Sequence, residues 1–272
     1  MIFNAKLLTS SLLIGAAHAT STRGAHCARH GDLAINVVNA AARDYIGLEP
    51  AFEAFRDILG GDNNGNNAGP FEDGHRQINW DAPIVPFDMP GNFFASTVDR
   101  GLTVNANRPE FRVSNPADGS DHLFDSITPE AAEDFSTFSP QRLFAPLKDN
   151  KILVTFSVPG TKGHQRGTVD GFGAIYSDVE RDGKTLIIYY DVHGCEIHRE
   201  AAKPFDKGLS FVGAHFEETP IYSVVIGNGD LPLIHTKPIC NTIRCKLGYE
   251  KPKFDVVAMD DFLFSEPQAY YN

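Results

Sequence analysis

Residues 185–198, TLIIYYDVHGCEIH, predict a β-hairpin. Apolar and aromatic residues fill its first half, Val192, His193 and Gly194 form the turn, and residues 195–198 begin the second strand. The stretch KILVTFSV at 151–158 also has an apolar residue at every second position, which is typical of a strand with one buried face. Both stretches therefore predict strands of antiparallel sheets.

Short strands of this kind recur through the rest of the chain. Turn-forming residues separate them and no helical pattern lies between them, which favours a mainly β protein folded as an antiparallel β-sandwich. With this many strands, the jelly roll is the commonest version of that fold. The expected strands are 102–104, 110–114, 151–158, 171–178, 185–190, 196–200, 209–216, 221–227 and 254–264.

The region before the strands has a different pattern. Residues 33–59 predict two helical runs, of which the second begins at Pro50 and ends at Gly60 and Gly61. The expected organisation is an N-terminal extension with helices at 20–60, followed by one β-sandwich domain at 61–272.

The first nineteen residues predict a signal peptide. Lys6 lies in a short basic start, an apolar run follows, and Ala17, His18 and Ala19 form a cleavage pattern. The alternative, a membrane anchor, needs a longer apolar run. We therefore expect a protein that is secreted to the extracellular space, with no membrane span.

The net charge narrows the classes of possible binding partners. The net charge is −11, and no basic patch with interleaved aromatic residues is present, so a nucleic acid is not an expected partner.

The chain has four cysteines, and three disulfide pairings are possible. Cys240 and Cys245 enclose a four-residue loop and are expected to pair, which leaves Cys27 to pair with Cys195. Zinc is the alternative for the close pair, although its spacing is unusual for that metal.

No catalytic motif is evident. The chain lacks G-x-S-x-G and H-E-x-x-H, and His193 and His198 are more simply read as surface residues than as a metal pair. We therefore expect no catalytic residues and a binding protein rather than an enzyme. A polysaccharide-active hydrolase and a secreted interaction or virulence factor remain alternatives.

Four aspartates are predicted ligands of a structural calcium ion: Asp178, Asp191, Asp260 and Asp261. Each follows or interrupts an apolar run, and calcium binds six to eight oxygen atoms. Alternation along a strand places Asp260 and Asp261 on opposite faces, so one of them should point inward or to a sheet edge. The alternative is that all four face water at turns and edges.

The only tryptophan, Trp80, precedes Asp81 in the stretch HRQINWD at 75–81. As a ligand-binding pair, Trp80 would stack on a sugar ring while Asp81 binds hydroxyl groups. In a metal site, Trp80 would shield Asp81. In the third interpretation Trp80 packs in the core, which its position on the same side as Ile78 favours, and Asp81 remains available on the polar side.

Several blocks occur in a characteristic order across residues 52–267. They include GHRQINWDAP, FSPQRLF, GFGAIYSDVE and DVVAMDDFLFSEP. In these blocks the chain resembles an uncharacterised domain of exported bacterial proteins. The resemblance implies export and a jelly roll similar to carbohydrate-binding modules, in which an aspartate at the position of Asp260 or Asp261 holds calcium.

The chain departs from that pattern at three places. Ala82 and Pro83 replace a glycine turn, the hairpin reads DVHG and loses one carboxylate, and an insertion at 231–253 carries Cys240 and Cys245. The family's sorting tail is not found, so we expect a released protein. The expected function is extracellular binding of a polysaccharide or other glycan, with a structural calcium ion.

Overall fold

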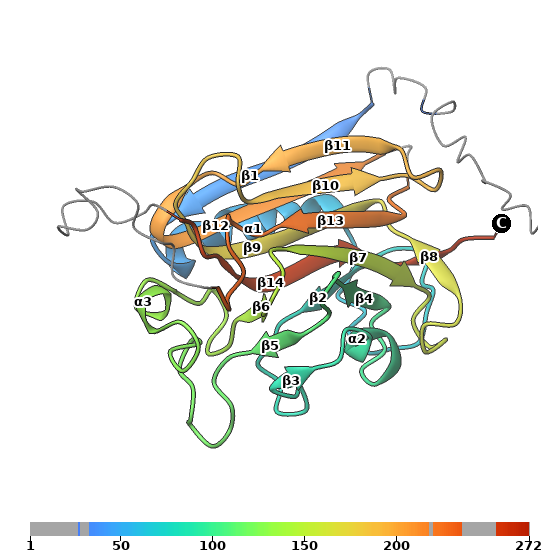
Figure 1. Ribbon diagram of the computed structural model, residues 1–272. Coiled ribbons are helices and arrows are strands. Elements are labelled where there is room, and N and C mark those ends of the chain that lie inside the picture. Colours follow the sequence, from blue (N-terminus) through green and yellow to red (C-terminus); the bar gives the residue numbers. More distant parts are fainter. Residues whose placement is uncertain (1–26, 28–32, 218–219, 236–253, 272) are drawn as a thin grey trace, which may run out of the picture.

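The structure is a computed structural model that describes Cys27 and residues 33–217, 220–235 and 254–271. The predicted signal peptide and the predicted Cys240–Cys245 disulfide lie outside the described residues. Within them the chain is mainly β and its strands form two antiparallel sheets (Figure 1). No helix in this part of the chain has the length and apolar character needed to cross a bilayer.

The first sheet has eight strands. Its order is β1-β12-β9-β14-β6-β5-β3, and β2 pairs with β14 beside this path. The strands are β1 (Ile35–Ala42), β2 (His75–Ile78), β3 (Asp88–Met89), β5 (Phe111–Val113), β6 (Phe144–Pro146), β9 (Gly171–Val179), β12 (Phe205–Phe216) and β14 (Ala258–Ser265).

The second sheet has seven strands in the order β11-β10-β13-β7-β8-β15, and β4 pairs with β7. The strands are β4 (Leu102–Asn105), β7 (Lys151–Ser157), β8 (Arg166–Thr168), β10 (Leu186–Tyr190), β11 (Glu196–Ala201), β13 (Ser223–Gly227) and β15 (Gln268–Ala269). The helices are α1 (Tyr45–Leu59), α2 (Phe93–Ser96) and α3 (Pro129–Ala132).

The predicted hairpin at 185–198 is confirmed. Leu186 pairs with Ala201, and the register shifts between Tyr189 and Tyr190 before the turn. The predicted Cys27–Cys195 disulfide is also present, and it links the segment before β1 to this hairpin. A bridge between residues 168 positions apart removes much conformational freedom from the unfolded chain.

The helical prediction for residues 33–41 is wrong. This segment is β1, which pairs with β12 along its whole length, from Ile35 opposite Phe216 to Ala42 opposite Leu209. The apolar spacing fits a helix, but ladder pairing with β12 decides the local structure.

Helix α1 begins before the predicted position. It starts at Tyr45, where the Asp44 side chain caps it by accepting a hydrogen bond from the Gly47 N–H, so Pro50 lies inside the helix. The predicted end at Gly60 is confirmed, because Gly60 has a φ of +70° that favours glycine.

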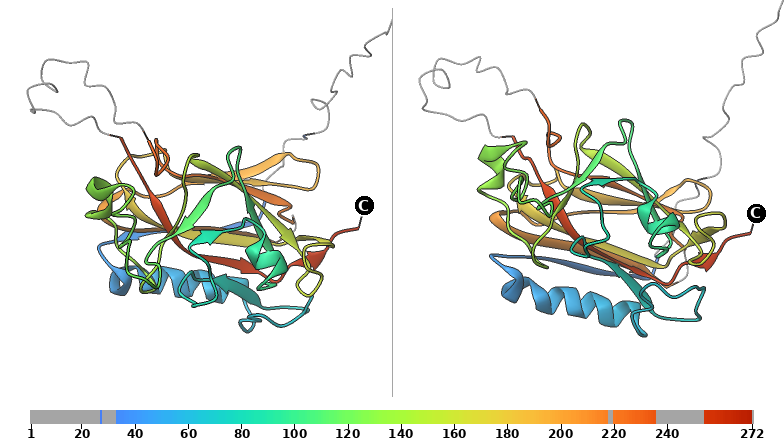
Figure 2. Two further views of the ribbon diagram at one scale, coloured as in Figure 1. Left: turned by 60° about the horizontal axis from the view of Figure 1, so that its bottom comes forward. Right: turned by 90° about the horizontal axis from the view of Figure 1, so that it is seen from below.

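The two sheets share one core. The ring of Phe156 in β7 lies 6.0 Å from the ring of Phe172 in β9 and 5.8 Å from that of Phe264 in β14. Helix α1 covers the opposite face of the first sheet (Figure 2). There the Phe55 ring packs over Gly173 and Gly213, and a Cβ atom on Gly213 would lie only 2.8 Å from that ring.

Candidate functional site

Trp80 lies two residues beyond β2 and is completely buried. Its ring stacks on Phe144 with centroids 4.3 Å apart, and its Nε1 donates a 2.9 Å hydrogen bond to the backbone oxygen of Asp260. Phe94 and Phe262 contact the indole edge-on. Because no ring face is open, the prediction of Trp80 as a sugar-stacking residue is wrong, and the packing interpretation is the one observed.

A β-bulge places Asp260 and Asp261 on one side of β14. Met259 pairs with Tyr176 and Phe262 with Ala174, so the two aspartates lie opposite a single residue of β9. The prediction that they face opposite sides is therefore wrong, because strict alternation fails at a bulge. Both side chains are fully buried.

The hydroxyl of Ser139 connects these two aspartates to Asp81. Its Oγ lies 2.8 Å from Asp261 Oδ1, 3.2 Å from Asp260 Oδ1 and 2.9 Å from Asp81 Oδ2. Asp260 also accepts a hydrogen bond of 2.6 Å from the Phe138 N–H. Asp261 accepts a hydrogen bond of the same length, 2.6 Å, from the Gln77 side-chain amide. We call Asp81, Ser139, Asp260 and Asp261 the carboxyl cluster.

Burial favours the neutral forms of the two inner carboxyl groups. Desolvation, followed by the negative charge of Asp261, raises the pKa of Asp260 well above its ordinary value. Desolvation is also the main cause that raises the pKa of Asp261, and the charge of Asp81 acts in the same direction. Asp260 and Asp261 therefore favour bound protons.

A cavity of about 700 Å³ opens beside the carboxyl cluster. Its polar lining consists of Asp81, Asn115, Asp121, His122, Gln141 and Arg142. Asp81 helps to shape this wall, because its Oδ1 accepts hydrogen bonds from the backbone N–H groups of Gln141 and Arg142, at 2.5 and 2.9 Å.

Asp121 is the unusual member of the lining. Its residue is only 3 % exposed, and its Oδ1 accepts hydrogen bonds from the backbone N–H and the hydroxyl of Ser126. Its buried Oδ2 has no hydrogen-bond partner among the residues that the structure describes. A buried polar atom without a partner is unfavourable by about 1–3 kcal/mol.

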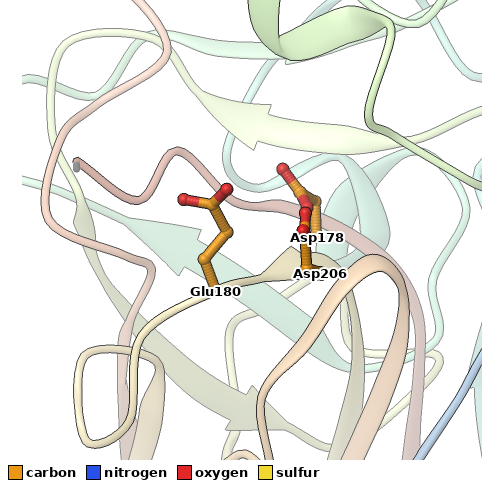
Figure 3. Close-up of side chains that lie close together, drawn as sticks. All are labelled: Asp178, Glu180 and Asp206. Atoms are coloured by element: carbon orange, nitrogen blue, oxygen red, sulfur yellow. The ribbon is translucent and has the colours of Figure 1, made fainter. Parts of the chain in front are cut away.

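A second acidic group lies at the end of β9. Oxygen atoms of Asp178, Glu180 and Asp206 lie within 4.8 Å of one another, and Figure 3 shows the side chains of Asp178 and Glu180 extending to the same side. Asp178 is buried, whereas Glu180 and Asp206 are exposed. Oxygen ligands in this arrangement can hold a divalent cation.

Burial and neighbouring charges both raise the pKa of the Asp178 carboxyl group. Desolvation raises its pKa to about 7, and the negative charges of Glu180, Asp134 and Asp206 add to the effect. A hydrogen bond from the Lys207 N–H to Asp178 Oδ1, 2.8 Å long, acts in the opposite direction. A cation would compete with the proton for this carboxylate.

The four predicted calcium ligands do not form one site. Asp191 lies in the β10–β11 turn, where its Oδ1 accepts from the N–H groups of His193 and Cys195 at 2.9 and 2.8 Å. Asp260 and Asp261 belong to the carboxyl cluster, and neither is in the cation-binding group found among the described residues. Of the predicted set, only Asp178 lies in that group.

Sequence reasoning missed several of the residues in these sites. Glu180 follows Asp178 by two positions, so the stretch SDVE carried a local signal for it. Asp206 is 28 residues away and is brought close by the pairing of Phe205 in β12 with Val179 in β9. Asp121 and Ser139 lie in irregular segments, where no periodicity predicts how side chains point.

Comparisons with known proteins found no match. No protein-family model matches the chain, and no curated protein and no solved structure matches it either.

Proposed function

We propose that this protein binds carbohydrate in the cavity beside Asp81 and Asp121. The observation that carries the proposal is a cavity about 700 Å³ in volume whose lining combines the carboxyl groups of Asp81 and Asp121 with amide and guanidinium groups. A sugar hydroxyl can donate to a carboxylate of this lining without bringing a charge into the site.

The rest of the lining suits a ligand rich in hydroxyl groups. Asn115 and Gln141 carry both donors and acceptors, and the Arg142 guanidinium is a donor. Polar groups of both kinds around one cavity suit hydroxyls, which donate and accept at the same atom. The apolar contacts of such a ligand would come from Pro83, Pro116 and Pro140, since Trp80 is not accessible.

Calcium at Asp178, Glu180 and Asp206 is the second element of the proposal. Three clustered oxygen ligands and the unfavourable burial of the Asp178 carboxylate support it. Calcium is favoured over transition metals because all three side chains offer oxygen. Its role would be structural, joining the end of β9 to the start of β12.

The wider context of the proposal comes from the sequence. We propose a secreted, extracellular jelly-roll protein related to the exported bacterial domain that its sequence blocks resemble. The two antiparallel sheets around one core and the Cys27–Cys195 disulfide support this view.

The test is a glycan array together with polysaccharide pull-downs, using mature protein shown to be folded. Selective retention on one class of glycan is expected. Blank results in both assays with folded protein would end the carbohydrate proposal. Release of reducing ends from a retained polysaccharide would instead indicate the hydrolase alternative.

A further inference from the structure

The carboxyl cluster contains more acceptor oxygens than its hydroxyl can serve. A serine hydroxyl donates one hydrogen bond and accepts up to two. Three carboxyl oxygens lie within 3.2 Å of Ser139 Oγ. If all three contacts are hydrogen bonds, two of them must use protons that the carboxyl groups supply.

Basic side chains near the cluster form their hydrogen bonds with other groups. Arg56 of α1 pairs with Glu53 and donates to the Gln77 side chain. Arg100 donates to the Gln77 backbone oxygen, and its positive charge also acts on Asp261. Arg142 donates to the Val85 oxygen. Within the part of the chain that the structure describes, no basic side chain forms an ion pair with Asp260 or Asp261.

The cluster fastens one loop to the first sheet. Residues 136–142 reach β14 through the Phe138 N–H and the Ser139 hydroxyl, and they reach Asp81 through the N–H groups of Gln141 and Arg142. The same loop contributes Pro140, Gln141 and Arg142 to the cavity lining. The position of one cavity wall therefore depends on this cluster.

We propose that the carboxyl cluster is a proton-operated latch that holds loop 136–142, and with it the cavity wall, in place at acidic pH and releases it when the protons are lost. With protons on Asp260 and Asp261, the three carboxyl groups and Ser139 form a closed set of hydrogen bonds. Without them, up to three negative charges surround a single hydroxyl, and their repulsion drives the loop outward. The latch goes beyond ligand binding, since it operates with an empty cavity.

The direction of the pH dependence follows from the raised pKa values of both inner aspartates. An unfolded Asp loses its proton near pH ~3.9. The folded protein keeps its protons to higher pH, so this contribution to stability is complete below about pH 4 and is lost as the pH rises through the raised values.

Trp80 is a built-in reporter of the latch. It is the only tryptophan, and its Nε1 donates to the backbone of Asp260. We would titrate the emission of the native protein between about pH 4 and 9, with chelator and no ligand. The expected result is a reversible transition with its midpoint above the pH range in which an ordinary Asp titrates. Tryptic cleavage after Arg142, measured relative to cleavage of an unstructured peptide at the same pH, should accelerate at least about tenfold across the same interval, since a released loop is open to the protease.

Asparagine variants separate the latch from other causes. Asp260→Asn and Asp261→Asn should each lose or shift the transition, whereas Asp57→Asn on the exposed face of α1 should leave it unchanged. Should the variants fail to fold, infrared difference spectra of the wild-type protein decide the matter. Burial raises the pKa of Asp178 to about 7 and that of Asp255 to about 6, so the spectra must show more carboxylic acid groups disappearing across the transition than these two account for. A flat titration above pH 5, or one abolished by added calcium, would overturn the proposal. Neither result depends on carbohydrate binding.

Discussion

The indole of Trp80 and the backbone of Asp260 are joined by one hydrogen bond of 2.9 Å. This bond connects the end of β2 to the bulge of β14 and positions the backbone from which the carboxyl cluster projects. Trp80, for which the sequence left sugar stacking, metal shielding and core packing open, thus packs in the core and supports the acidic site beside the cavity.

Replacing Trp80 with phenylalanine should destabilise the fold. The change removes the donor to Asp260 and leaves a buried carbonyl without its partner, which is unfavourable by about 1–3 kcal/mol. Urea denaturation followed by circular dichroism measures the difference. The exposed Tyr271→Phe change serves as the control and should stay within about 0.5 kcal/mol. Equal stability of Trp80→Phe and wild type would contradict this role.

Loss of the buried Arg76–Glu266 ion pair should lower the free energy of unfolding much more than loss of a similar pair near the surface. Arg76 is fully buried, contacts Glu266 at 2.7 Å and also donates to the oxygens of Gly65 and Asn67. Arg76→Met leaves Glu266 buried and unpaired and should lower the free energy of unfolding by about 3–5 kcal/mol.

The matched control for that variant is Arg112→Met. Arg112 pairs with Asp88 at 2.8 Å, but the Asp88 side chain is 79 % exposed. Its loss should change stability by about 1 kcal/mol or less. Denaturant midpoints measured side by side decide the comparison, and equal losses in the two variants would contradict the account of the buried pair.

Breaking the Cys27–Cys195 disulfide should weaken the fold. Cys195→Ser removes a bridge that closes a loop of 168 residues, and a native disulfide of this kind typically contributes about 2–5 kcal/mol. Peptide mapping of the oxidised protein would verify the pairing, and thermal melts would give the loss. An unchanged melting temperature would show that the bridge does not constrain the unfolded chain.

Calcium should raise the melting temperature of chelator-treated protein, since binding to the folded state alone stabilises it. With a pKa of about 7 for Asp178, protons and calcium compete, and the apparent affinity should rise about tenfold between pH 6 and pH 8. In the metal-free protein this carboxyl contributes stability below about pH 4 that is lost as the pH rises through 7. Asp178→Asn should abolish the calcium shift and Asp191→Asn should not. The absence of a shift in wild type would exclude the metal site.

The strands were predictable where alternation is strict. The pattern at 151–158 corresponds to β7, and the hairpin at 185–198 to β10 and β11. Segment 33–41 was not predictable, because its apolar residues fit either period and its pairing partner β12 is remote in sequence.

The candidate site was harder to predict than the strands. A bulge at Asp260 and Asp261 reverses the face assigned to one of them, and no local pattern reveals a bulge of this kind. The cavity joins Asp81 to the distant Asp121 through irregular segments. Such proximity depends on tertiary packing rather than on spacing along the chain.

Titration calorimetry with the glycan selected by the array would test the central claim most directly, by comparing wild type with Asp121→Asn and with the remote control Asp57→Asn. An asparagine amide at 121 removes one of the acceptor oxygens in the cavity lining, so the affinity should fall by at least about tenfold while Asp57→Asn binds as wild type does. Equal affinity of all three proteins would contradict carbohydrate binding in this cavity.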